Sequence, residues 1–574
     1  MTDRSHPEVE ATQGLDEAQA GLLTAMLSRW LLLASLEADG TALGRESKYP
    51  LPSTAERSPY LPLNMVHQTE PRIPAVSRCL SALMRALQIF DAQTGQAIEP
   101  DGFRLQPLSA WLTEIRPGDT EPLEHYLASG VCNVACEFCY EFGSPPELRT
   151  PKQRVTRSEL DTRLKYYDGA RGRALFDVFH QYYDAFSHPQ CMEFLKEIRT
   201  RTPGVLDLIT NGRTLTADVV ASLKHLHPLQ LTISLNSADP QKRKIVMRDK
   251  TPEVAAASLP LLHAAGVPFG LVIVPWPPEL DEEDLERTIL FSDAFRPCFV
   301  SVSLPGYTRY LPNVPDELTE DFHRRIVARV RRMRDIVCTP LLVQPRLAEA
   351  HWHHEDHTRP FVLGAMPDTA AEHCGFRYGD VIQTINGMRT RWAYEAHRFI
   401  ELADLYGELD LNIEFTRGGT ELTAVFPPSQ ARDRGRGFGL LIAQGLNPAP
   451  LKSVCRSVAA GERVLVLSSY LMRPEVELML HELGSPPAPG QCEVHAVSND
   501  YFGGNIILGD LLTVKDFADH LRALGTRLTG FDRVFIPASP FSDWGRDLRG
   551  DSWEALRRNT PLPITFVANN RILV

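Results

Sequence analysis

Between about residue 121 and residue 345, apolar strand-like segments alternate with amphipathic helix-like segments. The strand-like segments are VLDLITNG, LQLTISLNS, VPFGLVIVP and FVSVSLPG, and they are interspersed with the helix-like CMEFLKEIRTRT, TADVVASLKHL, EVAAASLPLLHAAG and DEEDLERTILFSDAF. Because the strands are apolar at nearly every position, they are typical of a parallel sheet covered by helices. Five or six such units predict a full or partial barrel, with its chemistry at the C-terminal ends of the strands.

A chain of 574 residues is too long for one domain, and three or four are expected. Residues 1–120 combine helical periodicity with Pro-rich loops and contain no catalytic pattern, and they predict a mainly helical region. The His-rich segment 345–360 is interpreted as a linker. Short strands and Gly-rich turns in 361–430 predict a small β-rich domain, and renewed alternation in 438–574 predicts a second α/β domain.

The charge and the cysteine usage limit the partners and the compartment. A net charge of −12 disfavours non-specific nucleic-acid binding, which needs a basic surface. The most apolar segment near the N-terminus, residues 21–36, is interrupted by Arg29 and is too short to span a bilayer. No signal-peptide core is present, and seven of the ten cysteines are scattered singly. We therefore expect a cytoplasmic protein that binds neither nucleic acid nor a membrane.

The stretch GVCNVACEFCYEFGSP, residues 130–145, holds Cys132, Cys136 and Cys139. A structural zinc site needs four ligands, and no second knuckle occurs at matching spacing. A thioredoxin-like redox pair needs only two cysteines. Three thiolates can hold three irons of a [4Fe–4S] cube and leave the fourth iron free to chelate a small molecule.

The spacing C-x3-C-x2-C, with Phe138 directly before Cys139, resembles the signature of the radical S-adenosylmethionine (radical SAM) superfamily. The resemblance implies that Cys132, Cys136 and Cys139 ligate a [4Fe–4S] cluster and that SAM binds the open iron. It implies reductive cleavage of SAM to methionine and a 5′-deoxyadenosyl radical, which abstracts hydrogen from a substrate. It also implies an electron donor such as flavodoxin or ferredoxin.

The resemblance further implies a set of cofactor-binding residues. Phe138 and Tyr140 flank Cys139 and are expected at the cofactor site. YYDAFSHP stands where the family usually has a Gly-Gly-Glu-Pro-like segment. Asp184 would then accept a hydrogen bond from the SAM amino group. The alternative is that this segment is an ordinary loop.

Three more residues fall at strand ends or in segments where the family contacts SAM. Asn211 in LITNG resembles the third-strand motif and Ser234 in LTISLNS the fourth. For Asn211, turn chemistry before Gly212 is the alternative explanation. Arg248 in IVMRD lies where the family contacts SAM.

GFRYGDVIQTINGM resembles the core of a PDZ domain. The matching positions are Gly375, Gly379, Asp380, Ile385, Asn386 and Gly387. PDZ domains bind peptide termini by strand addition, and the carboxylate-binding loop would lie near 360–364. A purely architectural unit packed against the barrel is the alternative.

In the last domain, Asn499, Gly503 and Gly504 form a loop whose amides could bind an anion; a turn that needs glycine at positive φ is the alternative. Together the segments resemble uncharacterised bacterial radical SAM proteins that combine the core with a PDZ-like unit and a C-terminal α/β domain. The predicted fold is α/β. A partial (β/α)6 radical SAM barrel at 121–345 is joined by an N-terminal mainly helical region, a PDZ-like domain and a C-terminal α/β domain.

Three functional hypotheses remain. The first is a radical SAM enzyme acting on a small-molecule substrate, with no catalytic residue assigned beyond the cluster and with oxidoreductase, transferase and lyase chemistry all open. The second is a peptide- or protein-modifying enzyme whose PDZ-like domain recruits the target. The third is a non-catalytic scaffold stapled by iron–sulfur or zinc.

Overall fold

The structure of the chain is a computed structural model. It describes residues 132–148, 156–157, 184–201, 205–355, 358–406, 411–426, 437–443, 445–484, 490–541 and 546–567. The predicted N-terminal helical region (1–120) and the strand-like segment that leads into the cysteine loop lie outside these residues.

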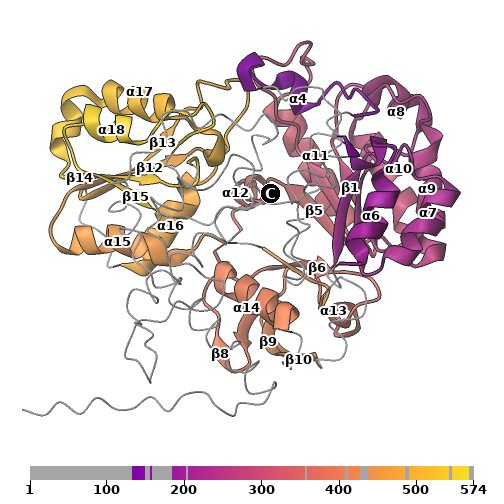
Figure 1. The fold of residues 1–574 in the computed structure, drawn as a ribbon. Coiled ribbons are helices and arrows are strands. Elements are labelled where there is room, and N and C mark those ends of the chain that lie inside the picture. The colour runs from indigo at the N-terminus through magenta and orange to yellow at the C-terminus, as the bar shows by residue number, and fades with distance from the viewer. Residues whose placement is uncertain are drawn as a thin grey trace, which may run out of the picture.

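The first sheet of the described chain is parallel, and its five strands follow one another in sequence order (Figure 1). These strands are β1 (Leu206–Thr210), β2 (Leu229–Ser234), β3 (Phe269–Ile273), β4 (Val300–Ser303) and β5 (Leu341–Gln344). The first four confirm the strands predicted from the apolar runs, and β5 was not predicted. A sequential, all-parallel order requires a crossover between each pair of strands, so every C-terminal strand end lies at the same edge.

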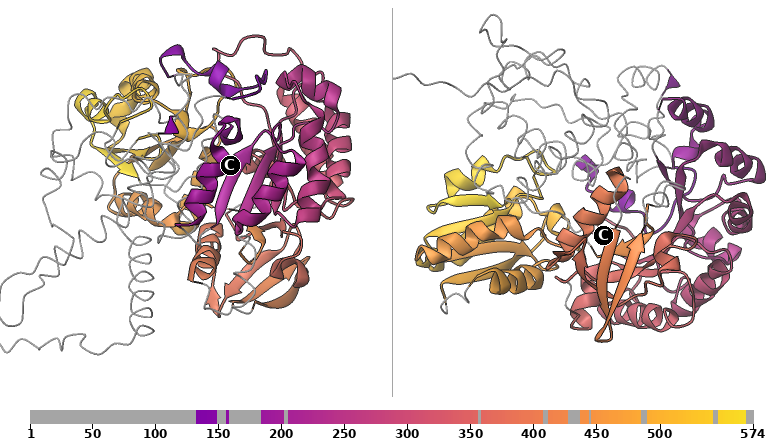
Figure 2. Two further views of the ribbon diagram at one scale, coloured as in Figure 1. Left: turned by 45° about the vertical axis from the view of Figure 1, so that its right-hand side comes forward. Right: turned by 90° about the horizontal axis from the view of Figure 1, so that it is seen from below.

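Helices form an arc on the outer face of this sheet (Figure 2). They are α6 (Cys191–Arg199), α7 (Ala217–Leu223), α8 (Pro240–Met247), α9 (Glu253–Ala265), α10 (Glu282–Asp293) and α11 (Glu320–Met333). In α11 the apolar Phe322, Ile326 and Val330 recur every four residues and are buried. Thr319 caps this helix by accepting a hydrogen bond from the Phe322 amide at 3.2 Å. Four of the six helices, α6, α7, α9 and α10, were predicted from the same periodicity.

The segment 345–360, interpreted as a linker from its charge, contains the helix α12 (Arg346–Trp352) instead. Glu349 in this helix is fully buried, and its carboxylate accepts from Arg334, the residue that follows α11. The Arg334 guanidinium also lies 3.9 Å from the centre of the Tyr378 ring in the β-rich unit. The linker interpretation was wrong because a charged segment can be buried when its charges pair.

The β-rich unit has a four-stranded sheet in the order β10-β9-β7-β8 and a two-stranded sheet of β11 and β6. Its elements are β6 (Val362–Ala365), α13 (Ala370–His373), β7 (Val381–Ile385), β8 (Met388–Arg389), α14 (Ala393–Tyr406), β9 (Leu411–Arg417), β10 (Thr420–Phe426) and β11 (Leu440–Ile442).

The predicted carboxylate-binding loop near 360–364 is largely strand β6, paired antiparallel with β11. Within it, the Val362 amide donates to the Asp380 carbonyl at 2.8 Å. A Cβ on Gly364 would lie 2.7 Å from the Pro340 side chain of the barrel. The backbone of this segment is therefore engaged within the chain, and its carboxylate-binding role stays a prediction.

The last part of the chain holds a four-stranded parallel sheet in the order β13-β12-β14-β15. Its elements are α15 (Pro448–Ala459), β12 (Val464–Ser469), α16 (Arg473–Leu483), β13 (Cys492–Val497), α17 (Val514–Leu524), β14 (Arg533–Pro537), α18 (Glu554–Asn559) and β15 (Ile564–Val567). Strand β12 is buried at every position, as a central parallel strand covered on both faces should be. In the parts of the chain that the structure describes, no helix has both the length and the apolar character needed to cross a membrane.

One carboxyl group in this last part of the chain, Asp510 in the short 3-10 helix Gly509–Leu511, gives a pH prediction. Burial raises the pKa of Asp510 from 3.8 to about 6, although a hydrogen bond with Ser539 opposes the shift. Between these two values the folded state binds more protons than the unfolded state, so stability falls as pH rises through about 6. Asp510→Asn should therefore stabilise the protein more at pH 7.5 than at pH 4.5, as measured by urea unfolding. The exposed Asp335 supplies the control, because Asp335→Asn should give the same small difference at both pH values; an equal effect of Asp510→Asn at both pH values would contradict the prediction.

Candidate functional site

The cysteine loop lies against the end of helix α8, which follows β2. The Ala135 amide donates to the Met247 carbonyl at 3.0 Å, and the Glu137 amide donates to the Val246 carbonyl at 2.9 Å. The loop then turns, with the Cys139 amide bonded to the Cys136 carbonyl at 3.1 Å, and continues as the short helix α4 (Tyr140–Gly143). These bonds fix the backbone that carries all three cysteines.

Cys132, Cys136 and Cys139 are free thiols and partly buried. Among the residues that the structure describes, no three His, Cys, Asp or Glu side chains form a group that could hold one metal ion. A tetrahedral zinc needs ligands that meet at one point, whereas an iron–sulfur cube takes one thiolate at each iron. Iron–sulfur ligation by these three cysteines stays a prediction.

The sulfur of Cys132 is the acceptor of several hydrogen bonds. The Asn211 side-chain amide points at Cys132 Sγ from 3.7 Å, and the backbone amides of Val134 and Asp184 also bond to it. Burial raises the pKa of Cys132 more than these bonds lower it. Hydrogen bonds to ligand sulfurs are among the features by which a protein tunes an iron–sulfur cluster.

The other two thiols are also held in their neutral form by their surroundings. Burial and the neighbouring cysteines raise the pKa of Cys136 well above its usual value, and burial raises the pKa of Cys139 to about 11. A thiolate is the form that binds metal, so these buried thiols need a positive charge beside them to ionise. An iron–sulfur cluster would supply that charge, and the donor set fits it.

Asn211 has the turn role considered for it in the sequence, and its predicted contact with SAM stays a prediction. Its side-chain oxygen accepts from the Arg213 amide at 3.0 Å, which is turn chemistry at the end of β1. Its side-chain nitrogen donates to the Asn133 side chain at 2.7 Å as well as pointing at Cys132. Arg213 also reaches back and donates to the Asn133 carbonyl. The end of β1 therefore holds the cysteine loop from its N-terminal side.

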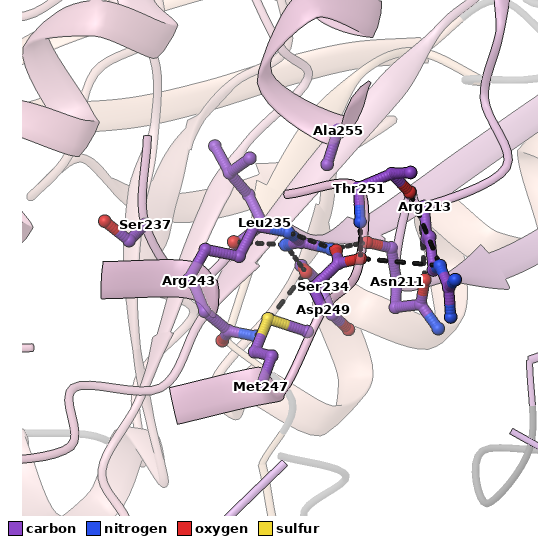
Figure 3. Close-up of polar contacts among 12 residues, drawn as sticks. Asn211, Arg213, Ser234, Leu235, Ser237, Arg243, Met247, Asp249, Thr251 and Ala255 are labelled. Atoms are coloured by element: carbon purple, nitrogen blue, oxygen red, sulfur yellow. Dashed lines mark hydrogen bonds and ion pairs between the residues drawn. The ribbon is translucent and has the colours of Figure 1, made fainter. Parts of the chain in front are cut away.

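The buried Arg243, paired with Asp249, joins the ends of β1 and β2, as Figure 3 shows. Arg243 of α8 is fully buried, and its Nε donates to Asp249 at 2.9 Å. Its Nη1 donates to the carbonyls of Leu235 and Ser234 at 2.7 and 3.1 Å, and its Nη2 donates to the Asn211 carbonyl. One guanidinium thus donates to three carbonyls at the strand ends, and the Leu235 carbonyl also accepts from the Ser237 amide at 2.7 Å.

Ser234, the last residue of β2, takes part in this network through its backbone carbonyl. The next polar residue, Asn236, links three elements. Its side-chain oxygen accepts from the Val274 amide after β3 at 2.9 Å, and its side-chain nitrogen contacts the Met247 sulfur at 3.2 Å. The cofactor role predicted for Ser234 therefore stays a prediction, while the structure places the residue at the expected strand end.

Asp184 is buried, and its oxygens bond within the chain. One oxygen accepts from the Phe186 amide at 2.9 Å, and the other accepts from the Thr210 hydroxyl and the Asn211 amide, both at 2.8 Å. Burial raises the pKa of this carboxyl despite these bonds. The described contacts give Asp184 a part in positioning Asn211 and Cys132, and its predicted contact with the SAM amino group stays a prediction.

The three remaining predicted residues lie in different surroundings. Phe138 packs against the buried Trp276, with ring centroids 6.0 Å apart. Tyr140 is 39% exposed. The Arg248 side chain is 67% exposed and lies 3.7 Å from the Glu137 carboxylate. Phe138 is thus part of the wall between the loop and the barrel core, whereas Tyr140 and Arg248 lie at the surface of the described residues.

The sequence analysis missed Arg243, Asp249 and Asn236. Arg243 and Asp249 belong to the highly charged stretch PQKRKIVMRDK, which reads as a solvent-exposed helix. Two signals in the sequence could have indicated them. Asp239-Pro240 is typical of a helix start, and in the structure Asp239 accepts a hydrogen bond from the Gln241 amide at 2.8 Å. The polar residues LNS stand at the end of a strand.

The comparisons with known proteins agree with this geometry. Residues 126–291 match the family profile of the radical SAM superfamily. No curated protein matches the chain in sequence.

Several solved structures are similar over part of the chain. SuiB of Streptococcus suis bound to S-adenosylmethionine is 14% identical over 38% of this chain and 48% of its own, with a TM-score of 0.28. The methyltransferase TsrM of Kitasatospora setae, with cobalamin and a [4Fe-4S] cluster bound, is 14% identical over 44% of this chain and 47% of its own, with a TM-score of 0.26. The similarity thus spans about half the length of these proteins, and its low scores leave the family profile as the basis for the assignment. Residues 126–291 therefore match the radical SAM superfamily, and the enzymatic activity, the [4Fe–4S] cluster and the SAM that this match implies are taken up in the proposal below.

Proposed function

We propose that Cys132, Cys136 and Cys139 ligate the [4Fe–4S] cluster, that SAM binds its fourth iron, and that the enzyme abstracts hydrogen from a small-molecule substrate. The observation that carries this proposal is that the loop bearing the three partly buried thiols lies against Asn211 at the end of β1 and against the end of α8. Active sites in barrels of this type are built at those strand ends.

When bound, the reduced cluster supplies one electron that splits SAM into methionine and a 5′-deoxyadenosyl radical, which takes a hydrogen atom from the substrate. The protein's own contribution is positioning and exclusion of water. Asn211 and the amides of Val134 and Asp184 direct N–H groups at Cys132, and they would orient that ligand. Phe138 and the buried Trp276 form an apolar wall behind the loop.

The proposal also includes an electron donor and a class of substrate. A one-electron donor such as flavodoxin or ferredoxin would reduce the cluster. The peptide-recruiting function of the PDZ-like unit gains no support from segment 360–364, because its amides at Val362 and Gly364 lie in strand pairing or against the barrel. A small-molecule substrate is therefore the hypothesis that we retain.

Anaerobic reconstitution tests this function directly. The iron-loaded enzyme, incubated with SAM and dithionite, should form methionine and 5′-deoxyadenosine in equal amounts, as measured by liquid chromatography and mass spectrometry. Omitting dithionite should stop both products, because cleavage needs an electron. Formation of neither product by fully loaded enzyme would contradict the proposed function.

A further inference from the structure

The loop after β4 is paired with a loop of the last sheet. The Arg309 amide donates to the Phe502 carbonyl at 2.9 Å, and the Asn505 amide donates to the Tyr307 carbonyl at 3.0 Å. The first loop follows the C-terminal end of β4, and the second follows that of β13. The C-terminal edges of the two parallel sheets are therefore joined at this point.

Asn505 and Gly504 make this junction specific. The Asn505 side chain accepts from the Tyr307 amide at 2.6 Å and donates to the Pro305 carbonyl at 3.0 Å. Gly504 has a φ of +65°, and a Cβ there would lie 2.0 Å from the Tyr307 carbonyl oxygen. Only glycine allows this approach of two backbones.

The anion-binding alternative for the loop around Gly503 needs free backbone amides, but amides of this loop are already bonded within it. The Gly503 amide donates to the Asn499 carbonyl at 3.0 Å, and the Phe502 amide donates to the Asn499 side chain at 3.1 Å. The Asn499 side chain in turn donates to the Leu511 carbonyl at 2.9 Å. These contacts support the structural explanation of the glycines.

On its other side, the loop after β4 supports the helix that follows Cys139. The Thr308 hydroxyl donates to the carbonyl of Gly143, the last residue of α4. A Cβ on Gly143 would lie 3.3 Å from Leu311 Cβ, so α4 and the loop are in close contact. Segment 305–311, which we name the rim loop, thus lies between the last domain and the cysteine helix.

An apolar contact links the same partners independently. Tyr501, Phe502 and Leu548 form a small buried cluster in the last domain, and Leu148 packs against it. Leu148 lies only nine positions after Cys139. The last domain therefore contacts the chain that leaves the cysteine loop directly through apolar side chains, and indirectly through the polar contacts of the rim loop.

We infer that the last domain positions the cysteine helix through the rim loop, with Asn505 and Thr308 as positioning residues for the SAM site. The inference rests on the proposed function for its effect on SAM, whereas the mechanical coupling can be measured without any cofactor. Loss of the Asn505 side chain removes two hydrogen bonds from the rim loop, and loss of the Thr308 hydroxyl removes the bond to α4.

Hydrogen exchange of the whole chain tests the coupling. Asn505→Ala should raise exchange about tenfold in 501–506, in 305–311 and in 140–148, because local opening becomes easier when these bonds are lost. Thr308→Val should raise exchange in 140–148 and leave 501–506 unchanged. Asn559→Ala removes an exposed asparagine of the same domain and should change none of the three segments. Faster exchange in 501–506 without any change in 140–148 of Asn505→Ala would overturn the inference.

The second readout is SAM binding by reconstituted protein. Both variants should keep the iron content of the wild type and bind SAM several-fold more weakly, and the electron paramagnetic resonance spectrum of the SAM-bound cluster should change. Wild-type affinity and spectrum in both variants would overturn the inference and leave the proposed function intact. Failure of the wild type itself to bind SAM would contradict the proposed function, while the exchange experiment would still decide the coupling.

Discussion

Replacing any one of Cys132, Cys136 and Cys139 with alanine should abolish SAM cleavage. Each thiolate is proposed to hold a different iron, so two remaining cysteines cannot retain a cube with one open corner. The reconstituted variants should lose most of their iron and the absorption of the cluster, and they should form 5′-deoxyadenosine only at the level of iron-free protein. Iron analysis, visible absorption and product quantification measure these three outcomes.

The matched control is Cys338→Ala. Cys338 is exposed and free, and it lies outside the cysteine loop. This variant should load iron and cleave SAM as the wild type does. Full iron content and turnover in any of the three loop variants would show that its cysteine is not a ligand.

Arg243→Met should lower the free energy of unfolding by about 3–5 kcal/mol, the usual cost of leaving one partner of a buried ion pair unpaired. Asp249 would remain as a fully buried carboxylate, with Arg213 at 3.5 Å as its nearest other cation. The carbonyls of Asn211, Ser234 and Leu235 would also lose the guanidinium, although the Leu235 carbonyl would keep the Ser237 amide as a donor. The change is measured from the first transition in a urea unfolding curve of the protein.

Two further variants separate charge from hydrogen bonding in this network. Arg243→Met/Asp249→Leu removes both charges but still leaves the three carbonyls without the guanidinium, so it should recover only part of the lost stability. Lys250→Met, at an exposed position beside the pair, should change stability by no more than about 0.5 kcal/mol. Wild-type stability of Arg243→Met would show that the pair does not hold the strand ends together.

The barrel strands could be predicted because they are buried on both faces. Residues such as Leu229 and Leu231 give continuous apolar runs, and the structure confirms β1 to β4 at those places. Strand β5 was missed because its apolar run is only LLVQ, which lies just before the charged segment that begins at Arg346. Periodicity cannot distinguish so short an apolar run from a loop.

The cysteine ligand set could be proposed from sequence because its three residues are local, separated by four and three positions. The groups that hold the loop come from other elements. Asn211 lies 79 positions from Cys132, and Arg243 reaches the Asn211 carbonyl from 32 positions away. Such contacts depend on how helices return to the sheet, and no local pattern encodes them.

The roles of some glycines and charged residues could be assigned only from their contacts in the fold. Gly504 was ambiguous between an anion loop and a turn until the structure brought the Tyr307 carbonyl against it. Glu349 and Arg334 looked like solvated linker and helix charges, yet they pair in a buried position between the barrel and the β-rich unit. In both cases the partner lies far away in sequence.

The most direct test of the account is the electron paramagnetic resonance spectrum of the reduced, reconstituted enzyme with and without SAM, recorded beside metal analysis. Three cysteines per cube leave one iron without a protein ligand, so we predict about four irons per chain and a spectrum that shifts when SAM is added. Zinc in place of iron, or a full cluster whose spectrum SAM leaves unchanged, would contradict the account.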